Sequence, residues 1–184
     1  MILDSLLCFS GTSKGATGGV QSGANTDAPT TGTQTSSNII DLGIAGLPPS
    51  SGGGGARDMG IGDDPALKLL IEVVVAFTGG TSLQCTLQGA PDNGSGVPGS
   101  FTTMWTGPVV VEANLIVGAY LANIDVPRPV PGQPIPRFLQ LQYISVGTHG
   151  AGQVEACIVL DRFDQPTGTT GALSGYPAGI TVAN

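Results

Sequence analysis

Residues 67–88 read LKLLIEVVVAFTGGTSLQCTLQ, and this stretch decides the fold class. Its odd positions are apolar on both sides of a Gly-Gly break, namely Leu67, Leu69, Ile71, Val73, Val75, Phe77, Leu83, Cys85 and Leu87. A period of two with many β-branched residues is typical of strands that bury one face. The sequence therefore predicts an antiparallel hairpin here, with its turn at Gly79-Gly80.

Further stretches along the chain have strand character and are separated by residues that favour turns. They are residues 38–43, 101–105, 109–112, 115–124, 137–144 and 153–161. In the last two stretches, Leu139, Leu141 and Tyr143 are expected on one face, and Cys157 is expected opposite to Val154, Ala156, Ile158 and Leu160. No amphipathic helix is evident, and the prolines between 126 and 136 exclude one there. The pattern predicts an all-β protein, a jelly-roll-like antiparallel β-sandwich with an extended N-terminal arm and long Gly/Pro-rich loops.

The length of 184 residues suits one domain, so residues 1–184 are predicted to form a single β-sandwich. Residues 11–37 and 44–55 are rich in Gly, Ser and Thr and are predicted to be flexible or arm-like insertions. Residues 165–184 are predicted to form an extended tail.

The chain is acidic and unusually poor in charge. Charged residues make up 10% of it and the formal net charge is −7, whereas about 25% is ordinary for soluble domains. The six cations are scattered, so no basic patch is available for phosphate backbones or anionic lipids. We therefore expect neither a nucleic acid nor a membrane as partner. The low charge instead suggests a secreted or virion protein, or a surface that a partner covers.

The three cysteines, Cys8, Cys85 and Cys157, are far apart and have no metal-binding spacing. They are expected to be free thiols that act as small hydrophobic side chains, which suits assembly in a reducing cytoplasm.

Catalytic and cofactor motifs are weak throughout. His149 is the single histidine and lies between glycines, where an exposed turn residue is expected. Asp63-Asp64 precedes a proline and resembles a turn more than a cation site, and the Gly11–Gly15 stretch does not have the spacing of a phosphate loop. We expect no enzyme activity, no metal and no cofactor. The aromatic residues Phe101, Trp105 and Tyr120 could form a sugar platform or belong to the core.

Several short motifs, in order, resemble the capsid cement (decoration) proteins of short-tailed double-stranded DNA phages. They are Met1–Asp4, Asn38–Gly43, Ala56–Gly62, Arg137–Tyr143 and Val154–Asp161, the last of which ends in Ile158-Val159-Leu160-Asp161. The resemblance implies a sandwich on the outer capsid surface that clamps neighbouring major capsid protein subunits. It also implies a homo-oligomer, with a dimer favoured and a trimer possible, that is assembled in the host cytoplasm.

Two groups of residues carry these expectations. The motif turn contains Arg57, Asp58, Gly60 and Gly62, which are expected to have structural or contact roles. The candidate arm contacts are Ile2, Leu3, Leu6, Leu7 and Phe9. The main alternative is a glycan-binding β-sandwich module of a phage tail fibre or adhesin.

Overall fold

The computed structural model describes residues 7–10, 26–43, 67–128, 131–133 and 135–160. The strands are β1 (Thr31–Thr35), β2 (Ile40–Asp41), β3 (Leu67–Ala90), β4 (Thr102–Thr106), β5 (Val110–Val111), β6 (Tyr120–Asp125) and β7 (Phe138–Leu160). A 3-10 helix, η2 (Glu112–Asn114), lies between β5 and β6. All the strand pairs are antiparallel, and the predicted all-β sandwich is confirmed. In the described part of the chain, no helix has the length and apolar character needed to cross a membrane.

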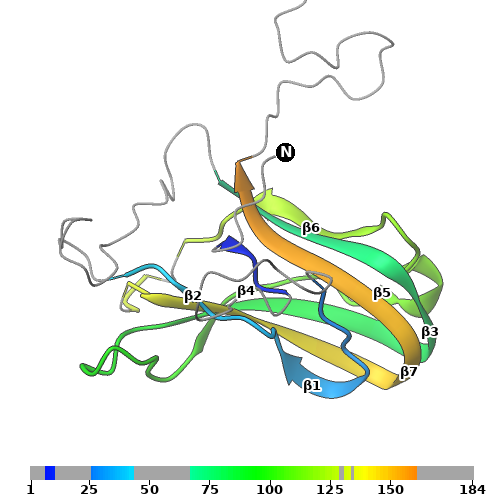
Figure 1. Ribbon diagram of the computed structural model, residues 1–184, viewed down its shortest axis with the longest axis horizontal. Helices are drawn as coiled ribbons and strands as arrows, with labels where there is room; N and C mark the ends of the chain where they lie inside the picture. The colour runs from blue at the N-terminus through cyan, green and yellow to red at the C-terminus, as the bar shows by residue number, and fades with distance from the viewer. Residues whose placement is uncertain (1–6, 11–25, 44–66, 129–130, 134, 161–184) are drawn as a thin grey trace, which may run out of the picture.

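Two long strands, β3 and β7, organise the fold. They pair with each other from Leu67 opposite Leu160 to Ala90 opposite Phe138. Both strands bend midway, so that the sheet folds over on itself (Figure 1). One layer contains the first half of β3, with β6 and the end of β7 beside it. The other layer contains the second half of β3, with β4, β5, the start of β7, β1 and β2.

The predicted hairpin within residues 67–88 is wrong. Gly79 and Gly80 lie inside β3, and the partner of both halves of this strand is β7. The two stretches at 137–144 and 153–161 are likewise parts of one strand, β7. Strand β7 also has glycines, at positions 147, 150 and 152, in the region that faces Gly79-Gly80. Because both strands contain glycines here, they can bend together and stay paired. We call this region, residues 74–82 of β3 and 146–153 of β7, the bend.

The core lies between the two layers and is built from alternate residues of both long strands. In β3 the buried residues are Leu69, Ile71 and Val73 in one layer and Leu83, Cys85 and Leu87 in the other. In β7 they are Leu139, Leu141 and Tyr143, then Val154, Ala156 and Ile158. The predicted inward faces are therefore confirmed at these positions. Val75 is the exception, with 41% of its surface exposed at the bend.

An aromatic pair fills the inside of the bend. The rings of Phe77 and His149 meet edge to face with centroids 5.0 Å apart, and both side chains are buried. A Cβ atom at Gly80 would overlap the imidazole ring, and one at Gly152 would overlap the Phe77 ring. The prediction that His149 is an exposed turn residue is wrong, because the glycines around the bend leave room for its ring inside.

Replacing Gly80 with Ala is expected to destabilise the protein by about 1–3 kcal/mol, because the added methyl group overlaps the His149 ring. The double variant with His149→Ala should be less destabilised than the sum of the two single variants, since the methyl group then has space. Denaturant unfolding of wild type, Gly80→Ala, His149→Ala and the double variant measures this coupling. Strict additivity would contradict the packing of the imidazole against Gly80.

The predicted flexible insertion at 11–37 is wrong for its last part. Residues 26–37 are described, and β1 within them pairs with β7 between Gln142 and Thr148. Most side chains of β1 are exposed and small or polar. The sequence of β1 therefore has no hydrophobic periodicity, and its backbone pairing with β7 could not be predicted from such a pattern. Residues 44–55 and 165–184 lie outside the described residues.

Candidate functional site

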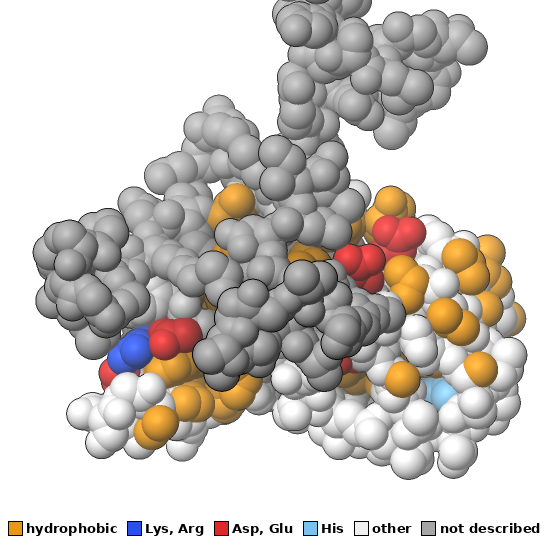
Figure 2. Space-filling view, in the orientation of Figure 1, with side chains coloured by type: hydrophobic (Ala, Val, Ile, Leu, Met, Phe, Trp, Pro, Cys, Tyr) orange, Lys and Arg blue, Asp and Glu red, His pale blue; other side chains and the backbone are white. Residues whose placement is uncertain are grey.

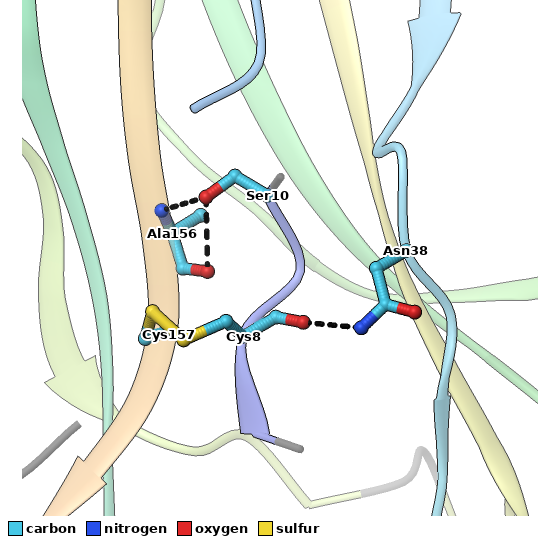
Figure 3. The surroundings of a disulfide bond; sticks show 5 residues. All are labelled: Cys8, Ser10, Asn38, Ala156 and Cys157. Carbon is cyan, nitrogen blue, oxygen red and sulfur yellow. Dashed lines mark hydrogen bonds between the residues drawn. A yellow bond between two sulfur atoms is a disulfide. The ribbon is translucent and has the colours of Figure 1, made fainter. Parts of the chain in front are cut away.

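A short N-terminal segment, residues 7–10, is attached to the edge of β7. Cys8 forms a disulfide with Cys157, with the two Cα atoms 4.0 Å apart (Figure 3). The two cysteines are paired as neighbours in an antiparallel bridge. Their side chains belong to a small apolar cluster with Val159 and Leu70, separate from the main core. The disulfide links positions 149 residues apart in the sequence.

Hydrogen bonds hold the same segment on both sides. The backbone N–H of Ala156 donates to Ser10 Oγ at 2.8 Å, and the N–H of Phe9 donates to the Ala156 carbonyl oxygen at 2.8 Å. On the other side, Asn38 Nδ2 donates to the Cys8 carbonyl oxygen at 2.6 Å. The backbone N–H of Asn38 donates to the Phe9 carbonyl oxygen at 2.8 Å. Asn38 therefore joins the 7–10 segment to the chain that enters β2 (Figure 3).

The structure corrects two predictions about this segment. Cys8 and Cys157 are bonded to each other, so the expectation of free thiols holds only for Cys85, where burial raises the thiol pKa to about 12. Phe9 is fully buried in the main core of its own chain, and Leu7 packs against that core. The Phe9 side chain is therefore not free to contact a neighbour, whereas that of Leu7 is partly buried. The other candidate arm contacts, Ile2, Leu3 and Leu6, lie outside the described residues.

A buried carboxylate attaches the chain before β1 to the sandwich. The hydroxyl of Tyr143 donates to Asp27 Oδ2 at 3.0 Å, and the N–H of Ser37 donates to Asp27 Oδ1 at 3.2 Å. Asp27 also exchanges backbone hydrogen bonds with Val154 on β7. Burial, and then the Asp27 charge, raise the pKa of the Tyr143 hydroxyl, so it stays a donor at neutral pH. No sequence pattern pointed to Asp27, because an isolated Asp in a polar stretch resembles a loop residue.

Arg137 ties together three parts of the chain at the end opposite to the bend. Its guanidinium binds Asp41 twice, with Nε 2.8 Å from Oδ1 and Nη2 3.0 Å from Oδ2. Its third nitrogen, Nη1, pairs with Asp92 in the loop before β4. This fork links the ends of β2, β3 and β7, and its residues Asp41 and Arg137 both lie within the short motifs noted in the sequence.

Asp92 gives this cluster a pH dependence. Hydrogen bonds from the backbone N–H of Gly96, then that of Gly94, and the Arg137 guanidinium hold the pKa of the Asp92 carboxyl below its ordinary 3.8. The stabilisation is therefore present above pH 3.8 and is lost as the pH falls through the lower pKa of the folded state.

Asp92→Asn is expected to reduce stability at pH 7, because the ion pair with Arg137 is lost. The difference from wild type should shrink as the pH falls below about 4, because the unfolded wild-type carboxyl then binds a proton and the folded one does so at its lower pKa. Urea unfolding of both proteins at pH 7 and pH 3 measures the two differences. An equal difference at the two pH values would argue against a charged Asp92 in the folded protein.

The remaining candidate site residues either lie outside the described residues or lie apart from one another. The turn residues Arg57, Asp58, Gly60 and Gly62 lie outside the described residues, as do Asp63, Asp64 and the Gly11–Gly15 stretch. Trp105 packs against the core from β4, opposite Leu87, whereas Tyr120 is exposed on β6 and opposite Glu72. The two aromatic rings thus lie on different layers. No group of three or more His, Cys, Asp or Glu side chains suited to a metal occurs within the described residues.

A model of the family Bbp16 matches residues 24–158, which run from just before β1 to near the end of β7. No curated protein matches the chain.

Proposed function

Because the chain belongs to the phage-related Bbp16 family, we propose that it is a capsid cement protein, which binds the outer surface of a phage head and clamps neighbouring major capsid protein subunits. The family match is the observation that carries this proposal. It covers the whole antiparallel sandwich, including both long strands almost to their ends.

The physical character of the sandwich supports the same role. The charged groups of Asp41, Asp92 and Arg137 are engaged with one another, and the single histidine packs inside the bend. A cement protein needs area and a rigid shape, and it gains retention from many copies on a symmetric shell. The long paired strands, the Arg137 fork and the anchored 7–10 segment together provide that rigidity.

Assembly in the host cytoplasm, which was expected from free thiols, requires the Cys8–Cys157 bond to form at a later stage. Cytosolic thiols are kept reduced, and disulfides persist outside the cell. The Cys8–Cys157 bond would then close after the particles are released, when the protein already sits on the shell.

The test is binding to filled phage heads that lack this protein. Purified protein should co-sediment with the heads and saturate at a fixed number of copies per major capsid protein subunit. Treated heads should also withstand heating better than untreated ones. Failure to co-sediment, together with absence from purified particles, would reject the cement role.

A further inference from the structure

The disulfide between Cys8 and Cys157 is enclosed by protein. Cys8 is 0% exposed and Cys157 is 2% exposed, and both side chains lie in the small apolar cluster with Val159 and Leu70. A reductant breaks a disulfide when its thiolate attacks one of the two sulfur atoms, and the rate depends on access to that atom. Attack on this bond therefore requires the surrounding chain to open first.

The 7–10 segment has contacts with the sandwich that do not depend on the bond. The Phe9 ring is buried in the main core. The backbone of Ala156 is hydrogen-bonded to the Phe9 N–H and to Ser10 Oγ, and Asn38 holds the segment from its other side through two hydrogen bonds. These contacts can form while both cysteines are thiols. The segment can therefore dock on β7 first and bring the two cysteines together as neighbours in an antiparallel bridge.

The reduced and oxidised proteins differ in how easily this segment opens. In the reduced protein, hydrogen bonds and one buried ring hold a short segment at a sheet edge. Such a segment opens locally, at a lower free energy than global unfolding, and each opening exposes the two thiols to solvent. In the oxidised protein the bond itself joins the segment to β7, so this opening is prevented and the sulfur atoms stay covered.

We propose that residues 7–10 and Cys157 form a one-way redox lock. The lock closes by thiol–disulfide exchange with a small-molecule disulfide, and reductants reopen it only slowly while the protein is folded. The third cysteine does not compete for either partner, because Cys85 is buried in the main core on β3, opposite Tyr143. The lock is a property of the chain by itself. It therefore goes beyond the cement function and holds whether or not the protein binds phage heads.

The closing reaction has two exchange steps. The thiolate of one cysteine attacks the small disulfide, forms a mixed disulfide with one half of it and expels the other half as a thiol. The thiolate of the second cysteine then attacks the protein sulfur of the mixed disulfide and expels the second small thiol. The two cysteines lose two electrons, which reduce the small disulfide, and their two protons leave on the two small thiols.

Reduction of the full-length oxidised protein by dithiothreitol, without denaturant, tests the lock. Samples are quenched with iodoacetamide at intervals, and mass spectrometry counts the alkylated thiols. We expect the bond of folded wild type to be reduced more slowly, by about tenfold or more, than the same bond in urea, where its sulfur atoms are accessible. After the reductant is removed, oxidised glutathione should restore the bond without unfolding of the protein.

Ser10→Ala tests whether the segment controls both rates, because it removes the Oγ acceptor of the Ala156 N–H and leaves the cysteines in place. We expect reduction and re-oxidation each to be about fivefold faster than in wild type. Gly80→Ala is the control, since its methyl group destabilises the protein at the bend, against the His149 ring. Figure 2 shows the histidine near one end of the molecule, and Figure 1 shows the 7–10 segment (dark blue) away from the bend. Both rates of this control should stay within about twofold of wild type.

The proposal is overturned if folded wild type is reduced as fast as the protein in urea, or if the reduced protein regains the bond only after unfolding. It is also overturned if Gly80→Ala changes both rates as much as Ser10→Ala does, because exchange would then follow global unfolding. Circular dichroism checks that the variants are folded. If they are not, Asn38→Ala replaces Ser10→Ala and Asp92→Asn replaces Gly80→Ala.

Discussion

Ile71→Asp is expected to abolish folding of the sandwich. Ile71 is fully buried in β3 and faces the core between the two layers. A carboxylate there loses its hydration without gaining a partner, at a cost of several kcal/mol in addition to the lost apolar burial. Domains have a free energy of unfolding of only about 5–15 kcal/mol, so one such change removes most of the stability of the folded state. Circular dichroism and a thermal scan measure the outcome.

Val75→Asp is the matched control for this prediction. Val75 lies on the same strand and, like Ile71, occupies an odd-numbered position, but 41% of its surface is exposed at the bend. We expect this variant to fold with a loss of about 1 kcal/mol or less. If both variants unfolded to the same extent, burial at Ile71 would not be the cause.

Removal of the disulfide is expected to give the second largest effect. The bond closes a loop of about 150 residues, and the chain-entropy model assigns about 5 kcal/mol to loops of this length. The variant with Cys8→Ala and Cys157→Ala should therefore melt about 10 °C below oxidised wild type. Loss of the bond should also loosen the 7–10 segment first, because hydrogen bonds and the buried Phe9 side chain are then what hold it.

A reducing agent provides the control. It should lower the melting temperature of wild type toward that of the double variant and leave the double variant unchanged. Thiol titration of the denatured protein should find one free thiol, Cys85, before reduction and three after it. Three free thiols in air-oxidised wild type would show that the bond does not form.

The alternation of apolar residues in the sequence predicted the inward faces of the strands. Leu69, Ile71 and Val73 are buried as expected, as are Leu83, Cys85 and Leu87. This succeeds because side chains alternate between the two faces of any strand, whatever its partner is. The same periodicity could not predict the partner, so the Gly-Gly break was interpreted as a hairpin turn although it is a bend in a longer strand.

The contacts between distant segments were not predictable in the same way. The pairing of Cys8 with Cys157, of Asp27 with Tyr143 and of Arg137 with Asp41 and Asp92 joins residues that no local pattern relates. The environment of His149 was also missed, because only the folding of β3 and β7 over each other encloses its ring.

The sequence by itself determined the all-β class, the core faces of the two long strands and a surface poor in charge. These properties follow from local periodicity and composition, which each stretch of chain carries independently of the rest. Tertiary structure alone decided that β3 pairs with β7 along its length, that the 7–10 segment is bonded to the edge of β7, and that several large apolar side chains of residues 109–120 are exposed. These features depend on which distant segments meet, and that is fixed only when the bent sheet closes around its core.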